Sequence, residues 1–175
     1  MLKYVDTKVT FSEIPDEITL CVNISNCPCK CKGCHSPYLS EDTGTALTVK
    51  EVLSLIDNNK GISCICFMGG DSEPEEINVL AKHVSKRRKK VKVAWYSGRQ
   101  ELSKEINIRH FDYIKLGPYI EEKGPLTSRT TNQRFYAVLP VGYYNNVTGE
   151  KAKRYFLADF TQYFWHNDNK ENQGI

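Results

Sequence analysis

Residues 17–37 read EITLCVNISNCPCKCKGCHSP and join an apolar alternation to a crowd of cysteines. Apolar side chains occupy every second position from Ile18 to Ile24, which predicts a strand over residues 17–24. Residues 26–36 then hold four cysteines together with Pro28 and Gly33, a composition typical of a loop. The segment therefore predicts a strand that carries a cysteine-rich loop at its end.

Downstream of this loop, apolar runs alternate with helical patterns. Thr48 and Glu51 form a capping box in front of apolar residues at helical spacing, which predicts a helix from Thr48. Ser72 and Glu75 can cap a second helix in the same way. Further strands are expected at 62–68, 91–96, 112–117, 135–144 and 154–164, and a short helix at 100–106.

This order of strands and helices predicts an α/β fold with a mostly parallel sheet. At 175 residues the chain is too short for a closed eight-fold barrel, which needs about 250 residues. Right-handed crossovers place every strand-to-helix loop at one end of the sheet. The cysteine loop, Gly69–Asp71 and Ser97-Gly98 should therefore converge where ligands bind in such folds.

Charge and hydropathy narrow the class of protein. The net charge of +3 is too balanced to make nucleic acid the default partner. No apolar run approaches the roughly 18 residues of a membrane span, and the N-terminus lacks the apolar core of a secretory signal. A cytoplasmic protein without a membrane or nucleic-acid partner is expected. The last ten residues, 166–175, are expected to form a flexible tail.

The cysteines then require an explanation other than disulfides, which are rare in the cytosol. Seven is an odd number, and four of them fall within residues 27–34. All four could bind one zinc ion, although zinc sites normally use two separated pairs. Alternatively, Cys27, Cys31 and Cys34 could hold three irons of a 4Fe–4S cluster and leave the fourth iron open. Cys21, Cys64 and Cys66 are expected to be buried core residues.

The spacing Cys27-x3-Cys31-x2-Cys34 after a first strand resembles the signature of radical S-adenosylmethionine enzymes. Within that superfamily, CPCKCKGCHSP is similar to the activating proteins of anaerobic ribonucleoside-triphosphate reductase. FMGGDSEPEE, WYSG and DYIKLGPYIEE resemble the later motifs of this group, as does Asn132-Gln133-Arg134. The resemblance covers residues 15–140, in the same order and at similar spacing. It implies an incomplete β/α barrel, with residues 1–165 as one radical S-adenosylmethionine domain.

The resemblance also implies roles for individual residues. Cys27, Cys31 and Cys34 would bind three irons, and the open iron would bind S-adenosylmethionine. Asp71 would lie near the ammonium group of this cosubstrate, with Glu73 as a competing candidate. The remaining implied contacts to S-adenosylmethionine involve Gly33, Cys34, His35, Gly69, Gly70 and Ser97. Cys29 is an extra thiol and is not expected to be a ligand.

The activity implied is that of a glycyl radical enzyme activase. A one-electron donor such as flavodoxin or ferredoxin would reduce the cluster, and cleavage of S-adenosylmethionine would install a glycyl radical on anaerobic ribonucleotide reductase. Two alternatives stay open. One is an activase of a pyruvate formate-lyase-type enzyme, and the other is a zinc-binding module that only mediates protein interaction.

Overall fold

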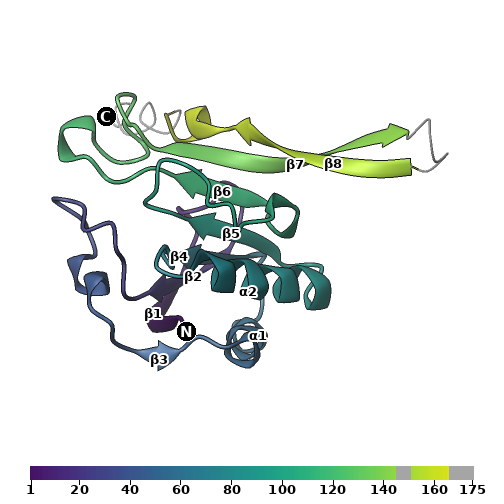
Figure 1. The fold of residues 1–175 in the computed structure, drawn as a ribbon, viewed down its shortest axis with the longest axis horizontal. Helices are drawn as coiled ribbons and strands as arrows, with labels where there is room; N and C mark the ends of the chain where they lie inside the picture. The colour runs from purple at the N-terminus through teal and green to yellow at the C-terminus, as the bar shows by residue number, and fades with distance from the viewer. Residues whose placement is uncertain (145–150, 166–175) are drawn as a thin grey trace, which may run out of the picture.

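A computed structural model describes residues 1–144 and 151–165, and the expected tail at 166–175 lies outside the described residues. The fold is α/β, with one open eight-stranded sheet in the order β3-β1-β2-β4-β5-β6-β7-β8 (Figure 1). The strands are β1 Lys3–Thr10, β2 Thr19–Ile24, β3 Thr45–Ala46, β4 Cys64–Met68, β5 Lys92–Tyr96, β6 Tyr113–Leu116, β7 Arg134–Tyr144 and β8 Lys151–Asp159.

The centre of the sheet is parallel. Strands β2, β4, β5 and β6 run in the same direction, and each is joined to the next in the sheet by a crossover. Antiparallel strands flank them on both sides, and the sheet does not close. The expected α/β class with a largely parallel, incomplete sheet is therefore confirmed.

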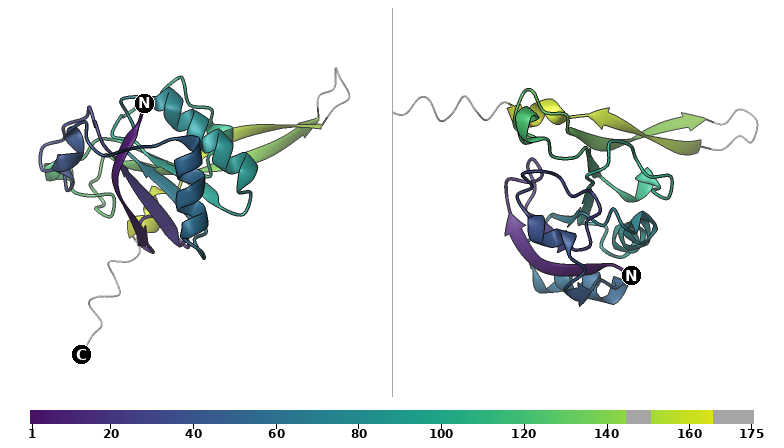
Figure 2. Two further views of the ribbon diagram at one scale, coloured as in Figure 1. Left: turned by 90° about the horizontal axis from the view of Figure 1, so that it is seen from below. Right: turned by 60° about the vertical axis from the view of Figure 1, so that its left-hand side comes forward.

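Two helices, α1 Val49–Asn58 and α2 Pro74–Arg87, cover the same face of the sheet (Figure 2). Their apolar sides pack on the central strands, where Phe67 and Trp95 are fully buried. Burial of such large apolar side chains stabilises the fold by about 1.5–3 kcal/mol each. Among the helices of residues 1–144 and 151–165, none has the length and apolar character needed to cross a bilayer.

The opposite face of the central strands carries a second, smaller core. It contains Cys21, Cys64 and Cys66, which are buried as expected, together with Phe135. The 3-10 helix η4, Thr161–Trp165, adds Phe164 to this core, so it covers the face that further strands would cover in a closed barrel. The central strands of the open sheet are therefore buried on both faces.

The helix starts differ in part from their predicted caps. Thr48 caps α1 as expected, since its hydroxyl accepts a hydrogen bond from the Glu51 N–H at 3.1 Å. The Glu51 carboxylate does not complete the capping box and instead accepts a hydrogen bond from the Tyr4 hydroxyl. For α2 the expected cap at Ser72 is wrong, because Pro74 takes the first helical position and makes Glu73 the N-cap residue.

Three other elements of the structure differ from the prediction. Strand β1 was not expected, because its polar sequence lacks an apolar alternation and much of it is exposed. Residues 100–106 form turns, and the short 3-10 helix η2 comes later, at Ile108–His110. Ser103 there donates to Glu105, a local side-chain contact that competes with helix formation. The strand expected at 154–164 ends at Asp159, where η4 follows.

Candidate functional site

The carboxyl ends of the parallel strands surround a cavity of about 200 Å³. The loops after β2, β4 and β5 converge there, as the crossover rule predicts. The cavity also reaches the loop after β6. Of the nine predicted site residues, six line it: Cys27, Cys31, Cys34, Gly69, Asp71 and Ser97.

Asp71 is the buried acidic group of the cavity, with 1% of its surface exposed. Its carboxylate accepts hydrogen bonds from the Ser97 hydroxyl at 2.5 Å and from the Gly98 N–H at 3.0 Å. Arg99 donates to the Asp71 backbone carbonyl at 2.7 Å, and its guanidinium lies 3.8 Å from the carboxylate. The loops after β4 and β5 are thus held together by the same carboxylate that faces the cavity.

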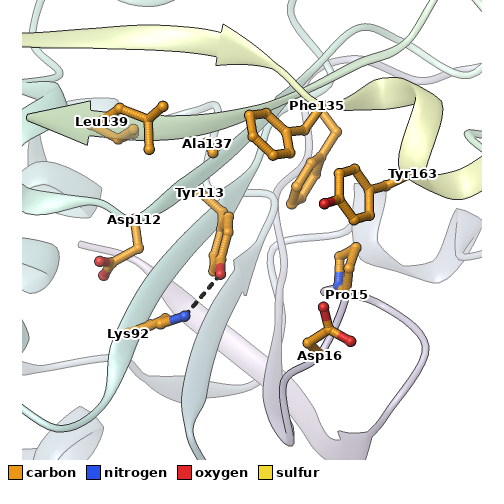
Figure 3. Close-up of a pocket in the computed structure, with 11 residues that line it drawn as sticks. Pro15, Asp16, Lys92, Asp112, Tyr113, Phe135, Ala137, Leu139 and Tyr163 are labelled. Carbon is orange, nitrogen blue, oxygen red and sulfur yellow. Dashed lines mark hydrogen bonds between the residues drawn. The ribbon is translucent and has the colours of Figure 1, made fainter.

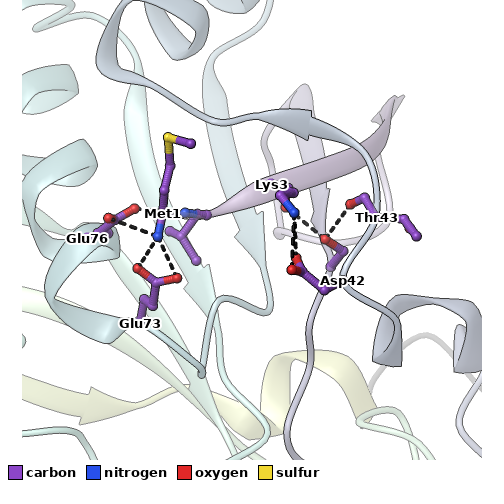
Figure 4. A network of polar contacts seen from close by, with 8 residues as sticks. Met1, Lys3, Asp42, Thr43, Glu73 and Glu76 are labelled. Carbon is purple, nitrogen blue, oxygen red and sulfur yellow. Dashed lines mark hydrogen bonds and ion pairs between the residues drawn. The ribbon is translucent and has the colours of Figure 1, made fainter.

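Glu73, the alternative to Asp71, lies elsewhere. Its carboxylate accepts hydrogen bonds from the Met1 ammonium group at 2.5 and 2.7 Å, beside Glu76 (Figure 4). Glu73 is not among the residues that line the cavity. Of the two acidic candidates, only Asp71 can therefore reach a ligand bound there.

Gly69 and Gly70 allow the chain to turn sharply after β4. Both have positive φ values, +96° and +84°, which favour glycine. A Cβ atom on Gly70 would lie 2.5 Å from the Ile77 side chain of α2, so this glycine is required by packing on the helix. Gly69 lines the cavity and Gly70 does not. Their predicted contact with S-adenosylmethionine stays a prediction.

The cysteine loop carries four thiols to the cavity, those of Cys27, Cys29, Cys31 and Cys34, and all of them are unpaired. Asn26 and Lys30 have positive φ values of 57° and 44°, so the backbone turns sharply just before Cys27 and again between Cys29 and Cys31. The hydrogen bond between Cys27 and Cys29 lowers the pKa of Cys27 to about 6 and raises that of Cys29 well above its ordinary range. The lowered pKa of Cys27 favours its thiolate, the form that binds metal.

Cys29 lies close to Asp71, with its sulfur 3.9 Å from a carboxylate oxygen. Within residues 1–144 and 151–165, the donor atoms of Cys27, Cys29 and Asp71 are the one group of three metal-ligand candidates that lie within 4.8 Å of one another. A tetrahedral zinc ion would bring four thiolates to about 3.8 Å from one another, as Zn–S bonds of about 2.3 Å require. Cys31 and Cys34 do not join this group, so the four thiols are not gathered around one point.

The donor set fits an iron–sulfur cluster instead. Cys27, Cys31 and Cys34 line a common cavity with soft sulfur donors, which iron–sulfur clusters take. A second hollow, on the side of Lys30 and Pro37, is lined by the same three thiols, so they stand between two open spaces. These residues would hold a cluster through three irons, while the Cys29 sulfur lies next to Asp71.

Gly33 and His35 lie beside the cavity and are not among its lining residues. The His35 ring is 5.2 Å from the ring of Tyr119, measured between centroids. Tyr119 in turn lines the cavity, so His35 touches its wall from outside. The predicted contacts of both residues with S-adenosylmethionine stay predictions.

Several lining residues were not predicted, and Lys115 on β6 is the most informative. Its ammonium group donates to the Gly117 carbonyl at 3.1 Å and lies 5.8 Å from the centroid of the Tyr96 ring. Burial lowers the pKa of Lys115, and the Asp71 carboxylate opposes that effect. Gln133 and Met68 line the cavity as well. The one sequence signal for the position of Lys115 is the alternation along β6, which places it on the same face of the sheet as Tyr113.

A separate pocket of about 310 Å³ lies at the opposite, amino-terminal end of the parallel strands (Figure 3). Its walls include Tyr113 and Phe135, whose rings are stacked 5.6 Å apart. Lys92 at its edge donates hydrogen bonds to Tyr113 and to the buried Glu17. None of the predicted site residues lies in this pocket.

A family model described as a 4Fe-4S single cluster domain matches residues 18–134, which include every residue of the cysteine loop and every residue that lines the cavity. Neither the comparison with curated proteins nor that with solved structures found a match. The matched region ends where β7 begins, so the β7–β8 hairpin lies beyond it.

Proposed function

The chain belongs to the family of 4Fe-4S single cluster domains, and we propose that it is a radical S-adenosylmethionine activase that generates a glycyl radical on anaerobic ribonucleoside-triphosphate reductase. Family membership supports an iron–sulfur-dependent function and argues against a zinc module. The observation that carries the finer proposal is the cavity itself. It combines four cysteine thiols, three of them at the proposed ligand spacing, with a buried carboxylate, and it is open at the ligand-binding end of a parallel sheet.

In this proposal Cys27, Cys31 and Cys34 hold the cluster. The chemistry that the bound groups supply is a one-electron reductive cleavage of S-adenosylmethionine, with an electron from flavodoxin or ferredoxin, to methionine and a 5′-deoxyadenosyl radical that takes an α-hydrogen atom from a glycine of the partner. The protein supplies binding, orientation and exclusion of water.

Asp71 and Lys115 give the cavity one negative and one positive side chain. The amino-acid end of S-adenosylmethionine carries an ammonium and a carboxylate group, so the two charges are complementary to it. The Asp71 carboxylate is already oriented by Ser97 and Gly98, and it keeps lone pairs for an ammonium donor. Such an oriented carboxylate offers a charge-assisted hydrogen bond at little cost in side-chain entropy.

The sheet also suits a macromolecular substrate. It stays open, and the loops of the described residues leave the cavity accessible from outside. A peptide loop of a partner protein could enter such an opening and seal the reactive centre from water.

Anaerobic reconstitution with iron and sulfide tests the first part of this proposal. The loaded protein should contain about four irons and four sulfides per chain, as a single cluster requires, and with a reductant it should convert S-adenosylmethionine into 5′-deoxyadenosine. A colourless protein that holds zinc and no labile sulfide would contradict it. Radical formation on a pyruvate formate-lyase-type enzyme instead of the reductase would change only the partner.

A further inference from the structure

Strands β7 and β8 form a hairpin that extends well beyond the body of the molecule (Figures 1 and 2). Strand β8 is the last strand of the sheet, so in the part of the chain that the structure describes its outer edge pairs with nothing. An unpaired edge of nine residues is a template for a further strand.

The hairpin exposes large apolar side chains on both of its strands. Directly paired residues share a face, and one face carries Leu139 opposite Phe156, which are 38% and 45% exposed. The same face continues outward with Val141 and Tyr143, which are 48% and 38% exposed. A two-stranded ribbon with so many exposed apolar side chains is marginal in water on its own.

The backbone directions of β8 follow from its hydrogen bonds. The Phe160 N–H donates to the Phe135 carbonyl at 2.8 Å, and these residues continue the β7–β8 register. Backbone groups alternate between the two edges of a strand, so even-numbered residues of β8 point to β7. The N–H and C=O groups of Lys153, Tyr155, Leu157 and Asp159 therefore point to the free edge.

We propose that a second copy of this chain pairs with β8 along this edge, in an antiparallel arrangement with Phe156 on the twofold axis. In this register Tyr155 lies opposite Leu157 of the other copy, and Lys153 lies opposite its Asp159. Both pairs consist of residues whose backbone groups point outward, so each pair can exchange two hydrogen bonds. Phe156 meets its own counterpart across the axis, where side chains approach most closely.

Charge and side-chain chemistry favour this register over a twofold axis at residue 154 or at residue 157. A twofold axis at residue 154 would oppose two arginines, and an axis at residue 157 would place Tyr155 opposite Asp159. With the axis at Phe156, the exposed Lys153 meets Asp159, whose side chain is half exposed. One Asp159 carboxylate oxygen accepts hydrogen bonds from the N–H and the hydroxyl of Thr161, and the other lies 3.8 Å from Arg134. Opposite charges across paired strands stabilise the pairing.

A second copy is also the occupant that closes the assembly. The interface is self-complementary, so it uses up the free edge of both chains and leaves no β8 edge for further growth. The two bodies then lie at opposite ends of the paired strands, and the cavities at the cysteine loops remain accessible. The proposal does not depend on the proposed function, since it involves none of the residues of the cavity.

Sedimentation equilibrium of the full chain tests this proposal, with and without the cluster. A concentration-dependent dimer is expected. Tyr155→Pro removes an outward N–H that β7 does not use, and proline is tolerated at such edge positions. Because the dimer loses two hydrogen bonds, its dissociation constant should rise about tenfold to a hundredfold relative to Tyr155→Ala, which keeps the N–H.

A charge reversal supplies a second, milder test. Lys153→Glu should weaken the dimer on the order of tenfold, because two attractive pairs become repulsive. Lys50→Glu makes the same charge change on the exposed side of α1 and should leave the dimer intact. Circular dichroism should show unchanged folding in all four variants.

Three results obtained with this chain alone would overturn the proposal. The first is a monomer at the highest soluble concentration. The second is an equal dissociation constant of the dimer for Tyr155→Pro and Tyr155→Ala. The third is an equal dissociation constant for Lys153→Glu and Lys50→Glu. Pairing of the β8 edge with the reductase in place of a second copy, seen as protection of the Tyr155 and Leu157 amides only in that mixture, would also overturn it.

Discussion

Replacement of Asp71 should separate ligand binding from cluster binding. Asp71 is buried and is not one of the three residues proposed to bind iron, so Asp71→Asn should keep the iron and sulfide of the cluster. The variant loses the negative charge that we propose binds the ammonium group of S-adenosylmethionine. A hydrogen bond to a charged group contributes about 1.5–3 kcal/mol, so affinity should fall about tenfold to a hundredfold.

The structure adds a second consequence, for stability. Ser97 and Gly98 both donate to the Asp71 carboxylate, and Asp71→Ala would leave these two donors without their acceptor. Each buried donor left unsatisfied costs about 1–3 kcal/mol. Asp71→Asn keeps one side-chain oxygen as an acceptor, so it should lose less stability than Asp71→Ala while it loses similar affinity.

Isothermal titration of the cluster-loaded protein with S-adenosylmethionine, in the absence of oxygen, measures the affinity. Glu73→Gln is the matched control, because Glu73 is acidic and close in sequence but lies outside the cavity. Wild-type affinity is expected for that control. Unchanged binding in both Asp71 variants, at full iron content, would refute the role of Asp71.

The remaining predictions concern the cluster, stability and packing. Alanine substitution of Cys27, Cys31 or Cys34 should abolish the cluster, measured as iron and labile sulfide, while Cys29→Ala should keep it. A variant of one of the three that still assembles the cluster would show that the wrong cysteines have been assigned as ligands. Glu17→Gln should destabilise the protein at neutral pH by about 1–2 kcal/mol in urea unfolding, because the buried carboxylate that pairs with Lys92 becomes a neutral amide, and the half-exposed Lys92 limits the effect. Burial acts to raise the pKa of Glu17 but hydrogen bonds from Lys92 and its neighbours lower it overall, so this stability is present above the ordinary glutamate pKa and is lost as the pH falls below it; equal wild-type and variant stability at neutral pH would contradict the prediction. Gly70→Ala should lose about 2–4 kcal/mol in the same assay, from a positive φ and a clash with Ile77, and a loss below about 0.5 kcal/mol would contradict that reasoning.

The parts of the fold that the sequence predicts well depend on strong local signals. The run before Gly69 is continuously apolar, and it forms β4 in the buried centre of the sheet. Thr48 supplies a cap that the structure uses. Strand β1 lacks such a signal in its own sequence. It is ordered by its pairing with β2 more than by its composition.

The candidate site shows the same division. The cysteine spacing is local, so the three thiols could be named from the sequence, and the crossover rule brought Asp71 and Ser97 to the same end of the sheet. Lys115 and Gln133 reach the cavity through the order of strands β5, β6 and β7, which no local pattern encodes. The extra thiol of Cys29 was visible in the sequence, but its approach to Asp71 depends on the conformation of the loop.

Electron paramagnetic resonance tests the central claim most directly. The cluster-loaded protein is mixed without oxygen with reductant, S-adenosylmethionine and the anaerobic ribonucleotide reductase of the same cell. A glycine-centred radical should appear on the reductase chain, and it should be absent when S-adenosylmethionine is left out or when Cys31→Ala replaces the wild type. Formation of 5′-deoxyadenosine with no radical on any glycyl radical enzyme, or efficient modification of a free small molecule, would contradict the account.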